Sequence, residues 1–160
     1  MAIVASQSGA APPVVDVIDG VCQQPINLER TGELASWQTE RSLSKITPFA
    51  VARDDTLALL YVNITDSSMN ISAAVFSKFK VRWKEEFGEH NSNVEVVDDE
   101  TRLTATYEGE DFISGNKRPV TFGIRFTLVG GCIFSTVITE AGHGHRSHVV
   151  ALLDLIQLSS

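Results

Sequence analysis

Residues 118–142, RPVTFGIRFTLVGGCIFSTVITEAG, decide the fold, because two alternating apolar runs flank a Gly-Gly pair. Gly130 and Gly131 suit a two-residue hairpin turn, whose central residues adopt a positive φ that glycine reaches without a steric penalty. The stretch therefore predicts a pair of antiparallel strands over residues 120–129 and 132–139.

The same turn sets which side chains of this hairpin share a face. It places Leu128 opposite Ile133 and Phe126 opposite Ser135, so one face of the pair is apolar. We call the other face the mixed face, and we expect the rest of the chain to cover only part of it. The apolar face consists of Val120, Phe122, Ile124, Phe126, Leu128, Ile133 and Val137, and the mixed face carries Arg125, Thr127, Cys132, Phe134 and Thr136.

Two further strand pairs are predicted upstream. Residues 93–111, NVEVVDDETRLTATYEGED, have the pattern of another hairpin. Residues 48–64, PFAVARDDTLALLYVNI, contain two apolar runs on either side of the turn residues 53–55. The second of these runs is apolar on both faces, which is typical of a strand in the centre of its sheet.

Two helices complete the predicted fold. Residues 70–87 place Ile71, Val75, Phe79 and Trp83 at four-residue spacing, and Gly88 follows as a helix stop. Residues 147–158, SHVVALLDLIQL, predict a second amphipathic helix. The sequence thus predicts an α+β fold in which an antiparallel sheet of five to seven strands packs against these two helices.

Length and composition predict one domain. The chain has 160 residues, of which 43% are hydrophobic, enough to build a core. Residues 1–25 are rich in Ala, Ser, Gly and Pro and predict a mobile arm, so the single globular domain is expected over residues 26–160. No run reaches the roughly 18 apolar residues of a membrane helix, which predicts a soluble protein of the bacterial cytoplasm or envelope.

The two cysteines do not form a motif. Cys22 and Cys132 lie too far apart in sequence for a C-x-x-C pair, and we expect two unpaired thiols. The alternative is a bridge that closes a loop of more than a hundred residues. The chain-entropy model gives such a bridge about 4–5 kcal/mol of stabilisation.

The order of predicted elements from residue 48 to residue 159 is strand, strand, helix, four antiparallel strands and helix. This order resembles the PsbP/DcrB-like domains, small α/β/α sandwiches of photosystem accessory proteins, bacterial envelope lipoproteins and secretion chaperones. The resemblance rests on LLYVNITDSSMNISAAV at residues 59–75, on Tyr-Glu-Gly at 107–109 and on the final LIQLSS at 155–160. It implies an accessory or binding role and transfers no catalytic residue.

Charge is concentrated in one segment, which we call the acidic band. The chain has a net charge of −7, while residues 84–111 contain ten carboxylates and only two cationic side chains. Such a chain is unsuited to nucleic acid, whose phosphates attract clustered Lys and Arg, and instead predicts a basic protein partner. The residues we expect to contact it are Glu85, Glu86, Asp98, Asp99 and Glu100.

Residues 142–148, GHGHRSH, hold three of the four histidines. His143, His145 and His148 are therefore candidate ligands for Zn, Cu or Ni, with Glu140 and Asp154 as the nearest carboxylates in sequence. The alternative is a polar loop in which Ser147 caps the last helix. We favour this loop, and we predict no cofactor and only adventitious metal binding.

No local motif of catalysis is present: the sequence has no G-x-S-x-G, no G-x-G-x-x-G and no phosphate loop. The leading hypothesis is therefore a non-enzymatic accessory or partner-binding domain that uses either the acidic band or the mixed face. The alternatives are a small-ligand or metal-binding protein that uses the loop from His143 to His148, and an enzyme with a dispersed site.

Overall fold

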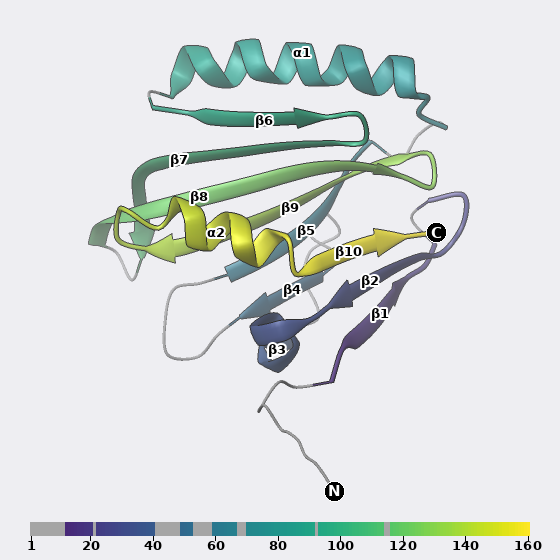
Figure 1. Ribbon diagram of the computed structural model, residues 1–160, viewed down its shortest axis with the longest axis horizontal. Coiled ribbons are helices and arrows are strands. Elements are labelled where there is room, and N and C mark those ends of the chain that lie inside the picture. Colours follow the sequence, from purple (N-terminus) through teal and green to yellow (C-terminus); the bar gives the residue numbers. More distant parts are fainter. Residues whose placement is uncertain are drawn as a thin grey trace, which may run out of the picture.

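A computed structural model describes residues 12–20, 22–40, 49–52, 59–66, 70–91, 93–113 and 116–160. These residues form two antiparallel sheets and two α-helices, which confirms the predicted α+β class, and Figure 1 shows their arrangement. The predicted turn at residues 53–55 and the first eleven residues of the predicted arm lie outside the described residues.

The larger sheet has seven strands in the order β3-β4-β5-β9-β8-β7-β6. Each neighbouring pair is antiparallel, and β5 lies between β4 and β9, inside the sheet as its two apolar faces predicted. Strand β6 forms one edge. The strands are β3 Gln38–Glu40, β4 Phe49–Ala52, β5 Leu59–Asp66, β6 Glu95–Asp99, β7 Arg102–Ile113, β8 Asn116–Val129 and β9 Cys132–Ala141.

The hairpin of β8 and β9 has the predicted register. Gly130 and Gly131 have φ values of 59° and 74°, as a two-residue turn of this kind requires. Leu128 pairs with Ile133, and Phe126 pairs with Ser135. The apolar and mixed faces of the hairpin are therefore those that the sequence predicts.

Helix α1, Ala73–His90, packs on the apolar face. Ser72 caps it by accepting a hydrogen bond of 3.2 Å from the Val75 amide. Phe79 and Trp83 of the helix each contact the Phe126 ring edge-on, with centroids 5.0 Å apart. The prediction that Gly88 ends the helix is wrong. The helix continues to His90, and the backbone N–H of Asn91 donates to the carbonyl of Phe87.

Helix α2, Arg146–Leu153, lies against the opposite face and contacts β7, β8 and β9. The predicted helix over 147–158 is wrong at its end, because the chain turns at residues 154–155 and continues as strand β10, Ile156–Ser159. Figure 1 shows α2 in front of β8 and β9, and β10 running on from its end beside β2. The run Ile-Gln-Leu-Ser suits a strand because its residues alternate between half-buried and exposed positions.

Strand β10 belongs to a second sheet that the sequence analysis did not predict. Its strand order is β1-β2-β10, with β1 at Val14–Ile18 and β2 at Ile26–Arg30. A short 3-10 helix, η2, follows at Gly32–Ser36. Residues 14–18 of the predicted mobile arm thus form a strand, and Ile18 anchors this strand because its side chain is buried in the core.

The core on this side joins the second sheet and α2 to the seven-stranded sheet. Buried residues from β2, α2 and β9 meet there, including Leu28, Leu152 and Phe134. Arg30 is also buried and donates hydrogen bonds of 2.8 Å and 3.1 Å to the carbonyls of Leu34 and Trp37. The chain therefore has three layers: α1, the seven-stranded sheet, and α2 with the three-stranded sheet.

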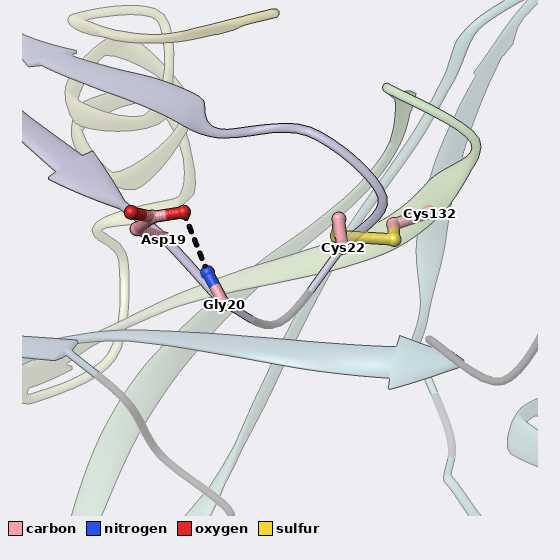
Figure 2. The surroundings of a disulfide bond; sticks show 4 residues. All are labelled: Asp19, Gly20, Cys22 and Cys132. Carbon is pink, nitrogen blue, oxygen red and sulfur yellow. Dashed lines mark hydrogen bonds between the residues drawn. A yellow bond between two sulfur atoms is a disulfide. The ribbon is translucent and has the colours of Figure 1, made fainter.

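A disulfide joins Cys22 to Cys132, and Figure 2 shows it linking the loop before β2 to the start of β9. The expectation of two unpaired thiols is therefore wrong. The pairing depends on a contact between distant segments that no local pattern predicts: Gln24 and Ile26, just after Cys22, lie against Gly130, beside Cys132.

Candidate binding site

Helix α2 covers one part of the mixed face closely and leaves another part open. A Cβ atom added to Gly123 of β8 would lie 2.1 Å from a methyl carbon of Val149, so helix and strand approach as closely as glycine permits. Towards the edge strand β6 the side chains on this face of β6 and β7 line a cavity instead of a packed core.

This cavity, which we call the trough, has a volume of about 580 Å³. Its floor comes from the three strands nearest the edge and its wall from α2, so it lies between elements with rigid backbones. The floor residues are Glu95, Val97, Asp99, Arg102, Thr104, Thr106 and Arg125, and the wall residues are Arg146, Ser147, Val150 and Asp154.

Arg125 is the buried charge in the middle of the trough, with only 7% of its surface exposed. Its Nε donates a hydrogen bond of 2.8 Å to the Thr104 hydroxyl on the neighbouring strand. Its Nη2 donates one of 2.7 Å to the carboxylate of Asp154 on α2. Its Nη1 is buried and has no hydrogen-bond partner among the residues that the structure describes. A buried guanidinium N–H without a partner is costly, because it loses water and gains nothing.

Arg146, the first residue of α2, also lines the trough. Its Nη1 lies 2.9 Å from the Glu95 carboxylate on β6 and donates a hydrogen bond of 2.9 Å to the Thr106 carbonyl on β7. Its Nη2 donates to the backbone carbonyl and the side-chain oxygen of Asn93. This arginine therefore ties the start of α2 to the edge of the sheet.

Two of the three histidines of residues 142–148 bind different partners. The His143 ring lies 2.9 Å from the Gly109 carbonyl, and His148 lies between two carboxylates. His145, and not Ser147, is the N-cap residue of α2, and it makes no side-chain cap bond. Within the described residues, no group of three or more His, Cys, Asp or Glu side chains is arranged to hold a metal ion.

His148 is held by both of its ring nitrogens. Nδ1 lies 2.7 Å from Glu140, on β9, and Nε2 lies 3.1 Å from Glu33, in η2. Because a carboxylate only accepts hydrogen bonds, both nitrogens must donate, so this geometry requires the protonated imidazolium. The hydrogen bond to Glu33 is the main cause that raises the pKa of His148 above 6.5, and Glu140 adds to it against the opposing effect of burial.

The acidic band divides into structural and exposed carboxylates. Lys80 and Lys84 of α1 donate hydrogen bonds of 2.7 Å and 2.8 Å to the two oxygens of Asp98, and these bonds lower the pKa of Asp98. Asp99 lies 3.5 Å from Arg102. The other three predicted contact residues, Glu85, Glu86 and Glu100, are exposed and form no ion pair among the described residues.

No family model, no curated protein and no solved structure matches this chain. Among the described residues, no helix is long and apolar enough to cross a membrane. The site therefore has to be interpreted from its own geometry.

Arg125 lies on the mixed face, which was predicted to be partly covered, but the trough itself was not predicted. A usable signal was present, because β7 places Arg102, Thr104 and Thr106 at alternate positions on one face. Three polar residues in this register indicate a strand face without a helix above it. Arg146 and Asp154 carried no such signal, because their role depends on where α2 lies.

Proposed function

We propose that this chain is a non-enzymatic binding domain that takes a small polar ligand in the trough. The observation that carries the proposal is the trough itself, which combines a buried, incompletely paired arginine with a floor from β6, β7 and β8 and a wall from α2. Ligand sites typically measure about 300–1,000 Å³ and contain a few convergent polar groups on an otherwise preformed scaffold. The volume of about 580 Å³ lies within that range.

A binding role fits the chemistry of the trough better than a catalytic role. Its arginines are held by carboxylates of the protein, Arg125 by Asp154 and Arg146 by Glu95, which fixes them as positioned donors. Of the described residues that line the trough, none is a histidine or a cysteine, the residue types that most often act as base or nucleophile.

The resemblance to the PsbP/DcrB-like domains belongs to the same proposal. The element order from β4 to α2, with β6 to β9 as four consecutive strands between two helices, supports that plan for the seven-stranded sheet. The resemblance favours an accessory role in which binding, not turnover, is the activity. The disulfide favours the cell envelope over the cytoplasm as the compartment, because thiols stay reduced in most cytoplasms.

The test is a fragment screen by nuclear magnetic resonance on the full chain. We expect small polar fragments to shift the amide signals of Thr104 and Thr106 in the wild type. Val150→Phe places a larger side chain in the trough and should abolish these shifts. Ala151→Phe adds the same ring at an exposed position of α2 and should leave them unchanged. Shifts that persist in Val150→Phe, or that never involve the trough, would contradict the proposal.

A second candidate function is the basic protein partner that the acidic band predicts. It is favoured by the three exposed carboxylates Glu85, Glu86 and Glu100, which no cation of the described residues neutralises. A polylysine peptide is a suitable probe, because its binding should weaken as salt shortens the Debye length to about 8 Å at physiological strength. Charge reversal at these three positions should also reduce the affinity. If neither added salt nor charge reversal changes the affinity, this surface is not the binding site.

A further inference from the structure

The hydrogen bonds that Arg125 makes indicate which chemical class of ligand the trough binds. A guanidinium presents two parallel N–H groups that match the two oxygens of a carboxylate, and such bidentate pairs are stronger than single bonds. In Arg125 the Nη2 group donates a hydrogen bond of 2.7 Å to one oxygen of Asp154, while the buried Nη1 group has no partner within the described part of the chain. One half of a carboxylate-binding fork is thus in use.

Asp154 has the properties of a residue that a ligand can displace. Its side chain is 60% exposed, and it lies at the C-cap of α2, where the helix dipole disfavours a negative charge. It can turn into solvent at small cost. Arg125, in contrast, is fixed from the other side by its bond of 2.8 Å to the Thr104 hydroxyl. The fork therefore stays in place when Asp154 leaves.

The charge of the lining selects among anions. The trough is lined by three arginines and three carboxylates, so it has no excess of positive charge. A monocarboxylate that replaces Asp154 at Arg125 preserves this balance, whereas a phosphate dianion adds a further negative charge close to Glu95 and Asp99. The apolar side chains of Val97 and Val150 provide contact area for a short hydrocarbon part.

We propose that the ligand of the trough is a small monocarboxylate, bound through both Nη1 and Nη2 of Arg125 in exchange for Asp154. This inference rests on the proposed function, because it assigns a ligand class to the same site. It makes Arg125 the residue that selects the ligand. It makes Asp154 an internal competitor, whose removal should strengthen binding.

Sodium butyrate is a suitable probe, and butyramide is its neutral counterpart of nearly the same shape. Titrations followed by nuclear magnetic resonance should show butyrate shifting the amide signals around Thr104, whereas butyramide and inorganic phosphate should have little effect. Arg125→Lys keeps the charge but removes the fork, and should weaken butyrate binding by about ten- to hundredfold. Asp154→Asn should tighten it by about two- to fivefold, which is the effect of losing one exposed competing ion pair.

The outcomes separate the two proposals. Equal binding of butyrate and butyramide in the trough, or weaker butyrate binding by Asp154→Asn, would overturn the carboxylate inference and leave the binding function intact. If no fragment of any charge shifts the trough signals, the proposed function fails as well. The Asp154→Asn and butyramide arms remain decisive even if Arg125→Lys does not fold, because Asp154 is exposed and the amide control uses the wild-type protein.

Discussion

Loss of the disulfide should destabilise the chain strongly, and the structure allows the size of the effect to be worked out. Cys22 and Cys132 are 110 residues apart in sequence. A crosslink over that separation lowers the entropy of the unfolded chain by an amount worth about 4.8 kcal/mol at 25 °C in the chain-entropy model. Domains of this kind have a total free energy of unfolding of about 5–15 kcal/mol, so the bond accounts for a large part of it.

The assay is urea unfolding of the oxidised and the reduced wild type, followed by tryptophan fluorescence. For a slope of about 2 kcal/mol per molar urea, the midpoint should fall by about 2 M on reduction. Trp37 is buried in the core that also contains Cys132, whereas Trp83 packs against Phe126 on the opposite side of the sheet. The Trp83→Phe variant therefore reports on the disulfide side alone.

The matched control is a double variant, Cys22→Ser with Cys132→Ser, which should unfold like the reduced wild type and should not respond to reductant. Mass spectrometry must first confirm that the oxidised sample contains the intramolecular bond. If the bond is present and the urea midpoints of the oxidised and the reduced wild type differ by less than about 0.5 M, the loop-closure reasoning is wrong for this chain.

Two further predictions follow from local geometry. Because the pKa of His148 is raised by its bonds to Glu33 and Glu140, its stabilising effect should be full below about pH 6.5 and should be lost as pH rises through the higher folded pKa. The wild type should thus melt at a higher temperature than His148→Gln near pH 6, and this difference should shrink towards about pH 9. The stabilisation behind it is about 1 kcal/mol or less. A difference that does not change with pH would contradict the required imidazolium. Gly123→Ala should cost about 1–3 kcal/mol by its clash with Val149, and Val149→Ala in the same chain should relieve that clash; additive losses in the double variant would refute this.

The parts of the fold that could be predicted are those set by neighbouring residues. Gly130 and Gly131 specified a turn, and the turn specified the register of β8 against β9, because a two-residue loop leaves no freedom for the strands to slip. The end of α2 could not be predicted in the same way. The apolar run at 155–158 is too short to distinguish a strand from a helical turn, and its partner β2 lies more than a hundred residues away.

The candidate site was predicted only in outline. Alternation along the hairpin of β8 and β9 indicated, from the sequence alone, that the face with Arg125 would be incompletely covered. Whether α2 would cover Arg125 depended on how closely the helix could approach Gly123 and on where it would end. The pairing of Asp98 with Lys80 and Lys84 likewise depends on the packing of α1, so charge counts could not separate Asp98 from the exposed Glu85.

The most direct test of the account is a crystal structure of the protein with sodium butyrate. The account predicts a carboxylate in the trough with its two oxygens within hydrogen-bond distance of Nη1 and Nη2 of Arg125, and the Asp154 side chain turned away from its position 2.7 Å from Nη2. A structure at saturating butyrate in which Asp154 keeps that bond, and the trough contains only water, would contradict it.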